Sequence, residues 1–145
     1  MIDLRSFIFE NGEKLVTVKA YIYSFFYRFI VKHTSLKKLQ YKMGERDEES
    51  TYDEVPEKVE LSKNFAFHVN RITERLPWDQ KCFVRALTLR KLLLEEKISC
   101  TIYMGVQKED GKMKAHAWLR SGKLFLTGGS GEGFAVVAKF ATRCD

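Results

Sequence analysis

The pattern of the chain changes once, near residue 98. Before that point apolar residues recur every three or four positions, which is typical of amphipathic helices. After it they alternate with polar residues in runs rich in strand formers, separated by turn residues. Helices followed by antiparallel strands predict an α+β fold. At 145 residues the chain is long enough for one domain with a core that needs no staples.

Three helices are expected in the first part. The apolar spacing predicts them over residues 15–31, 57–76 and 80–97. Pro77 ends the second helix, and Asp79 is a good N-cap for the third. These helices supply apolar faces for the core, although the first one also has the composition to meet a partner.

An acidic segment separates the first helix from the rest. Residues 43–56 are rich in Glu and Asp and almost lack aliphatic residues. Such a composition predicts a mobile connector. We therefore expect a helical segment at 1–42, the flexible acidic connector at 43–56 and the folded core at 57–145.

Four strands are expected after residue 98. They cover residues 99–108, 113–120, 123–127 and 134–140. With Ser121 and Gly122 as a two-residue turn, His116 would lie opposite Thr127, and Trp118 opposite Phe125. The other face of this hairpin would pack against the helices through a small apolar set: Ala117, Leu119, Leu124 and Leu126.

Charge and cysteine content exclude several classes of protein. The net charge of +6 favours acidic partners without naming one. Nucleic-acid binding is not expected, because no motif combines basic and aromatic residues. Three scattered cysteines give no disulfide framework and fit a reducing cytoplasm. Without a CxxC motif we expect no structural zinc, and no cofactor is implied.

The first helix is also the most apolar stretch of the chain. Residues 15–31 include Lys19 and Arg28, and they are too short and too charged to span a bilayer. A basic n-region is missing, so no secretory signal is expected. Packing into the core or against a partner is the plain interpretation. Association with a membrane surface is the alternative.

Cys82 is a candidate nucleophile because it comes about one turn into the third helix. Free backbone N–H groups and the helix dipole favour an anion there. An imidazole delivered from a strand, such as His116, would complete the arrangement of a cysteine protease or transglutaminase. From spacing alone, a buried inert Cys82 and a structural His116 remain open. We expect Cys100 to be core packing and Cys144 to be incidental.

Several motifs occur together in a recognisable order. They are PWDQKCFVRAL at 77–87, TIYMGV at 101–106, AHAWL at 115–119 and TGG at 127–129. From about residue 57 to 141 the chain resembles the leader peptidases of lasso-peptide biosynthesis. The resemblance implies a transglutaminase-like, papain-related fold.

The resemblance also implies an activity. The expected enzyme is a cysteine peptidase that removes the leader from a ribosomally made lasso-peptide precursor through a thioacyl intermediate. Cys82 would be the nucleophile and His116 the general acid/base. The backbone N–H of Cys82 would stabilise the oxyanion. The side chain of Gln80 either assists it or belongs to an ordinary first helical turn.

Partners follow from the same resemblance. Some members fuse a leader-recognition domain to the peptidase, and 42 residues leave no room for one before the connector. We therefore expect a stand-alone peptidase that acts on the precursor leader with a separate leader-recognition protein and a lasso cyclase. A transglutaminase-type acyltransferase and a non-catalytic peptide-binding or scaffold module remain alternatives.

The third catalytic residue departs from the family pattern. The family usually has an Asp on the strand after the histidine strand, and none lies between Asp110 and Asp145. Thr127 could accept the imidazole N–H if it faces His116, although a hydroxyl stabilises imidazolium less than a carboxylate does. Asp79 or Glu132 could also serve from a loop.

The aromatic pair beside His116 has two interpretations. Trp118 and Phe125 could form the wall of the peptide site, or they could close a second small core. Trp78 is expected to pack.

Overall fold

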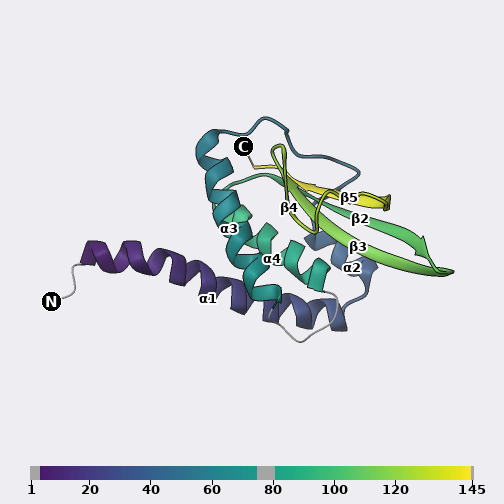
Figure 1. The fold of residues 1–145 in the computed structure, drawn as a ribbon, viewed down its shortest axis with the longest axis horizontal. Coiled ribbons are helices and arrows are strands. Elements are labelled where there is room, and N and C mark those ends of the chain that lie inside the picture. The colour runs from purple at the N-terminus through teal and green to yellow at the C-terminus, as the bar shows by residue number, and fades with distance from the viewer. Residues whose placement is uncertain (1–3, 75–80, 145) are drawn as a thin grey trace.

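Helices and a sheet form separate layers in this computed structural model, which describes residues 4–74 and 81–144 (Figure 1). The helical elements precede the four long strands, so the α+β prediction is confirmed. The helical elements are α1 (Leu4–His33), α2 (Leu36–Leu39), η1 (Gln40–Lys42), α3 (Pro56–Glu74) and α4 (Lys81–Glu95).

Within the described residues the sheet is antiparallel and has five strands, in the order β1-β5-β2-β3-β4. The four expected strands are present, each within two residues of its predicted ends. The sequence did not predict the short strand β1, which pairs with β5. The strands are β1 (Glu45–Arg46), β2 (Cys100–Glu109), β3 (Lys112–Ser121), β4 (Leu124–Thr127) and β5 (Ala135–Thr142).

The core surrounds α4, which lies between the other long helices and the sheet (Figure 1). Leucines on several sides of α4 are buried, because α1 and α3 cover the sides that the sheet does not. Each fully buried leucine contributes about 1.5–3 kcal/mol. The main core residues of α4 and of the sheet are Val84, Leu87, Leu89, Leu92, Leu93, Ile102, Leu119 and Phe140.

The first helix packs on α4 along one side. Ala20, Tyr27 and Ile30 are buried there. The Tyr23 hydroxyl donates a hydrogen bond of 2.7 Å to Glu95 at the end of α4, and this bond raises the pKa of Tyr23 to about 12. Within the described residues, no helix is long and apolar enough to cross a membrane.

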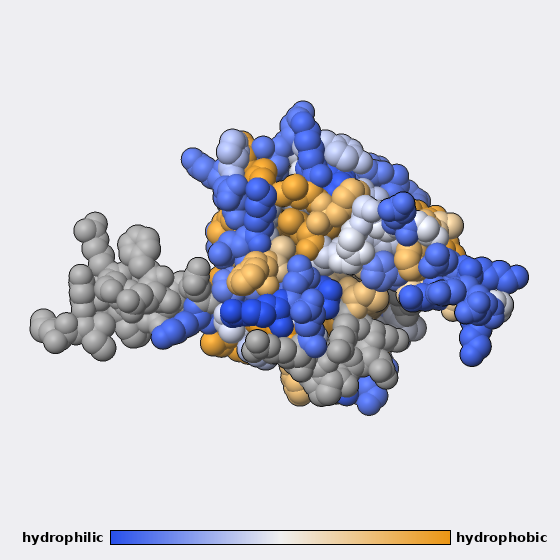
Figure 2. Space-filling model, in the orientation of Figure 1, coloured by the Kyte–Doolittle hydropathy of each residue, from blue (hydrophilic) through white to orange (hydrophobic). Residues whose placement is uncertain are grey.

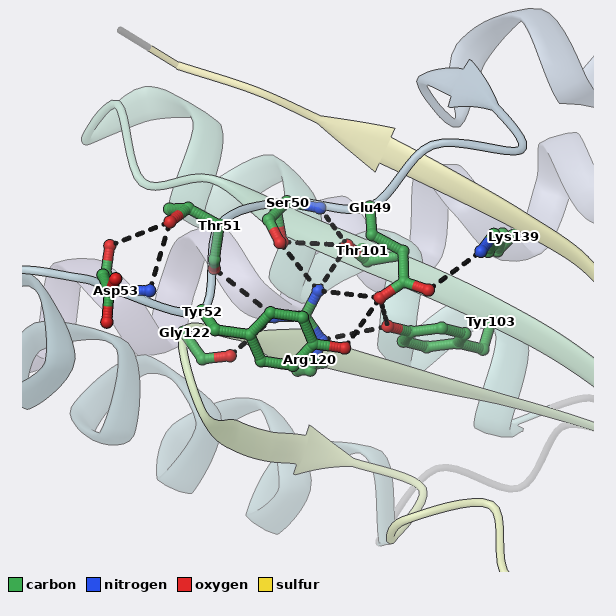
Figure 3. Close-up of polar contacts among 10 residues, drawn as sticks. All are labelled: Glu49, Ser50, Thr51, Tyr52, Asp53, Thr101, Tyr103, Arg120, Gly122 and Lys139. Carbon is green, nitrogen blue, oxygen red and sulfur yellow. Dashed lines mark hydrogen bonds and ion pairs between the residues drawn. The ribbon is translucent and has the colours of Figure 1, made fainter.

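The acidic segment is attached to the sheet rather than free of it. We call residues 45–53 the strap. It begins as the edge strand β1, paired with β5, and residues 49–53 then lie over the face of the sheet opposite the helices (Figure 3). Ser50 is buried, and its backbone N–H donates to Thr101 Oγ1 at 2.8 Å. The composition of residues 43–56 predicted a mobile connector, and within that segment the strap makes these contacts with the sheet. Composition shows the acidic residues but not the distant cations that hold them.

Arg120 of β3 is the main anchor of the strap, and only 1% of it is exposed (Figure 3). Its guanidinium donates to the backbone oxygen of Ser50 at 2.9 Å and to that of Gly122 at 2.6 Å. It also donates to the Tyr103 hydroxyl at 2.9 Å and lies 3.8 Å from the centre of the Tyr52 ring. The planar, permanently charged guanidinium suits such a buried, multidentate position.

Glu49 of the strap pairs with two cations of the sheet, Arg120 and Lys139. Its carboxylate accepts hydrogen bonds from Lys139 at 2.8 Å and from Tyr52 at 2.7 Å, and it lies 3.5 Å from Arg120. The hydrogen bonds from Lys139 and then Tyr52 lower the pKa of Glu49 from 4.5 to about 2. The Glu49 carboxylate is therefore ionised at neutral pH, where it can pair with both cations.

Acid should weaken this attachment. The pKa of Glu49 is depressed by folding, so its contribution to stability is complete above pH 4.5 and is lost as the pH falls towards 2. Urea unfolding should show a lower stability at pH 3 than at pH 7, with a smaller difference in Glu49→Gln. An equal difference in the variant would show that other groups cause the acid sensitivity.

Candidate active site

One cavity brings together the two residues predicted to carry catalysis. Cys82 on α4 and His116 on β3 both line a space of about 740 Å³. No Lys, Arg, Asp or Glu is among the described residues that line it, so its walls are largely apolar. The remaining lining residues are Val31, Thr34, Leu39, Phe83, Met104, Gly105, Val106, Ala115, Ala117 and Val137.

Cys82 lies in the first turn of α4 and is half-buried. The first N–H groups of a helix have no partner within it, and the positive end of the helix dipole favours negative charge. A thiolate and a developing oxyanion are both stabilised in such a position. Cys100, in contrast, is buried in β2, and burial raises the pKa of its thiol to about 12.

His116 is held by a backbone carbonyl. Its Nε2 lies 2.7 Å from the oxygen of Gly128. A carbonyl oxygen only accepts, so Nε2 carries the proton and donates it. Nδ1 is then the basic nitrogen of the neutral ring. The ring also packs against Trp118 and Phe134, with centroids 5.9 and 5.0 Å away. These contacts fix both the tautomer and the orientation of the imidazole.

The predicted register of the β3–β4 hairpin is wrong, and this moves Thr127. The turn residues are Gly122 and Lys123, with Ser121 opposite Leu124, because Gly122 takes a positive φ of 56° at the first turn position. The register shifts again between Leu119 and Arg120, so Thr127 lies opposite Leu119 and not His116. The buried Thr127 hydroxyl has no hydrogen-bond partner among the described residues.

Thr127→Val should leave activity almost unchanged and should not destabilise the fold. Valine keeps the volume of the side chain and removes a buried hydroxyl that the described residues do not satisfy. We expect the free energy of unfolding to change by less than about 1 kcal/mol, measured by urea titration. A loss of activity as large as that of His116→Ala would instead make Thr127 a member of the catalytic set.

Gly128 holds the imidazole only because it has no side chain. Its φ is +72°, a conformation that residues with a Cβ rarely adopt. A Cβ there would lie 2.5 Å from the Ala117 oxygen and 3.0 Å from His116 Nε2. The loop could not keep its carbonyl at the imidazole with any other residue.

Gly128→Ala should therefore lower activity by about 10- to 100-fold, because the imidazole loses its fixed position. Gly129→Ala is the matched control. Gly129 has almost the same φ of +74°, but a Cβ there would meet nothing within 4 Å. Gly129→Ala reports the effect of backbone strain alone, and Gly128→Ala adds displacement of the carbonyl that holds His116. Initial rates of the two variants therefore separate the two effects. Equal losses would contradict the assigned role of Gly128.

Trp118 forms a second small core rather than a wall of the cavity. Only 2% of it is exposed, and its ring stacks on Tyr103 at 5.7 Å and contacts Phe134. A Cβ on Gly131 would lie 2.3 Å from the indole, so the glycine-rich loop covers the ring closely. Phe125 is 46% exposed on β4. Trp118 thus packs against His116 and against the glycine-rich loop, and it helps to hold both in place.

Four of the sequence predictions remain without a structural test. Trp78, Asp79 and Gln80 lie outside the described residues, as does Pro77. Glu132 is exposed, and the hydrogen bond at His116 Nε2 goes to Gly128 instead. The sequence did not point to the Gly128 carbonyl as the partner of His116, because every residue has a backbone oxygen and no residue type marks this one.

The Gly128-Gly129 pair was the only local sign that the backbone here takes an unusual conformation.

An α+β fold with a cysteine at a helix start and a histidine on a strand around one cavity defines a class: cysteine-dependent hydrolases and acyltransferases. Residues 25–139 match the transglutaminase-like superfamily, well over half of the chain. The chain therefore belongs to this superfamily. The match begins inside α1, so only the last nine residues of that helix, 25–33, belong to the matched region. No curated protein and no solved structure matches the chain.

Proposed function

We propose that this protein is a cysteine peptidase that releases the leader from a lasso-peptide precursor. The observation that carries the proposal is the shared cavity of Cys82 and His116, with the imidazole fixed by Gly128. Membership of the superfamily supports thioacyl chemistry in general. The order of the motifs between residues 77 and 129 supports the particular substrate.

The reaction has two steps. Nδ1 of the neutral His116 takes the proton of the Cys82 thiol. The resulting thiolate attacks the carbonyl carbon of the last leader residue, and the imidazolium of His116 donates that proton to the departing amine of the core peptide. Neutral His116 then takes a proton from water, whose oxygen attacks the thioester and releases the leader carboxylate. The N–H groups at the start of α4 stabilise the oxyanion in both steps.

A neutral carbonyl suits the histidine in this chemistry. In papain-like enzymes the side chain of an asparagine orients the catalytic histidine, so a carboxylate is not required. The Gly128 oxygen would provide the same kind of acceptor, at 2.7 Å from Nε2. The missing Asp is therefore no obstacle to activity.

Mass spectrometry can test the reaction and its acceptor. The protein is incubated with precursor and a separate leader-recognition protein in H₂¹⁸O, with and without an excess of a primary amine. One ¹⁸O atom in the new carboxylate of the leader supports hydrolysis. An amine adduct in its place would support the acyltransferase, and an intact precursor would support the scaffold module.

The partner can be tested in the same assay. A separate leader-recognition protein should accelerate cleavage, because the peptidase would otherwise have to find the leader alone. Full cleavage without that protein would contradict the two-protein arrangement but not the peptidase.

A further inference from the structure

The side of α1 that faces away from α4 carries an exposed apolar stripe. We call Leu15, Val18, Ile22, Phe25 and Phe29 the α1 stripe, and each is 51–62% exposed. Their spacing of three, four, three and four is that of a coiled-coil seam, which packs against another helix. On the face of the molecule drawn in Figure 2, a few hydrophobic side chains lie among charged ones in this region. A soluble protein rarely exposes such a continuous set without a function for it.

The α1 stripe continues into a hollow between α1 and α3. The hollow has a volume of about 660 Å³, and Val18 belongs to both. Its walls also include Lys14, Phe67 and Arg71, with the Arg71 guanidinium 5.5 Å from the Phe67 ring. No carboxylate is among the described residues that line it. A side chain that projects from a docked helix would enter this hollow, and a carboxylate would meet two cations there.

Charge decides what kind of helix fits. From Lys14 to His33 the sequence has no Asp or Glu. Lys19 pairs with Glu95 of α4 at 3.6 Å, and the other charged residues of this stretch are Lys14, Arg28 and Lys32. A second copy of α1 would place like charges beside one another, which disfavours self-association. A bilayer presents a flat surface that does not fill the hollow. The complement is a helix with acidic flanks.

We propose that the α1 stripe and the adjoining hollow bind an amphipathic helix of another protein, with an apolar seam flanked by Asp and Glu. Val31 and Thr34, at and just beyond the end of α1, line the cavity that holds Cys82 and His116. The same helix thus carries the α1 stripe on its outer side and borders the catalytic cavity at its C-terminal end. This docking surface is independent of the reaction proposed for Cys82.

Two synthetic helical peptides test the proposal. They share a leucine seam in heptad spacing and differ only in their flanking residues, which are Glu in one and Lys in the other. Fluorescence anisotropy with the full-length protein should show binding of the Glu peptide, with at least tenfold weaker binding of the Lys peptide. Added salt should weaken binding of the Glu peptide, because the contacts are partly ionic.

Three variants locate the site. Ile22→Glu should weaken binding of the Glu peptide at least tenfold, and Arg71→Glu should weaken it while it strengthens binding of the Lys peptide. Met113→Glu is the matched control. Met113 is equally exposed but lies in the β2–β3 hairpin, on the other side of the molecule (Figure 1), and its substitution should change nothing.

Four results would overturn the proposal. They are equal binding of both peptides, binding of neither, dimerisation of the protein alone through Ile22 in sedimentation, and binding to phosphatidylserine vesicles that Ile22→Glu abolishes while the peptides do not bind. Circular dichroism of each variant confirms that the fold is retained. Leader release by Met113→Glu and Ile22→Glu without partners reports on the reaction separately.

Discussion

Cys82→Ala should abolish leader release, with a loss of rate on the order of 10⁴-fold or more. Alanine cannot form the thioester, so the reaction loses its covalent intermediate and not merely a favourable contact. His116→Ala should lose almost as much. Because the two residues act as a unit, the double variant should be no slower than the slower of the two single variants. Single-turnover rates with the precursor measure all three.

Cys144→Ala is the matched control for this prediction. Cys144 is also half-buried and is not a cavity residue, and its backbone N–H rather than its thiol bonds to Ser99. Its loss should leave the rate unchanged. Leader release that survives Cys82→Ala would contradict the mechanism, and strictly additive losses of Cys82 and His116 would show that the two act separately.

Arg120→Met should destabilise the fold by about 3–5 kcal/mol, the cost of removing one partner from a buried ionic network. Methionine fills part of the space but donates nothing. The backbone oxygens of Ser50 and Gly122 would be left without the guanidinium, and Glu49 would lose a neighbouring cation. Urea unfolding at pH 7 gives the change in free energy, and the strap should become accessible to proteases.

Lys63→Met is the control for Arg120→Met. Lys63 forms an exposed pair with Glu60 at 3.3 Å, one helical turn away on α3. Such pairs contribute about 0.3–0.5 kcal/mol, so the loss should be small. If Arg120→Met cost no more than Lys63→Met, the strap would not depend on Arg120.

Local pattern was enough for the order of elements and for one pair of residues. Helical spacing and strand alternation each depend on a few neighbouring positions, so the three long helices and four strands could be predicted. The motifs around Cys82 and His116 correctly predicted two residues that line one cavity, although 34 positions separate them in the sequence.

Two features could not be predicted from local pattern: the register of the β3–β4 hairpin and the strap that covers one face of the sheet. A turn that begins one residue later, with one bulge, moved Thr127 away from His116, and no local signal distinguishes these registers. The strap appeared mobile from its composition, because its cationic partners Arg120 and Lys139 come some 70 to 90 residues later.

The sequence by itself determined the fold class, the positions of α3, α4 and the four strands from β2 to β5, and the candidate nucleophile and base. It placed the first helix at 15–31, whereas α1 begins at Leu4. The tertiary structure alone decided what orients the base, what covers the sheet and which side of α1 is exposed. Helices and strands can be predicted because the spacing of apolar residues depends on a few neighbouring positions. These other features depend on backbone oxygens and on contacts between residues far apart in the sequence. The carbonyl of Gly128 is the clearest case, since every residue has one and only the fold places this one at His116.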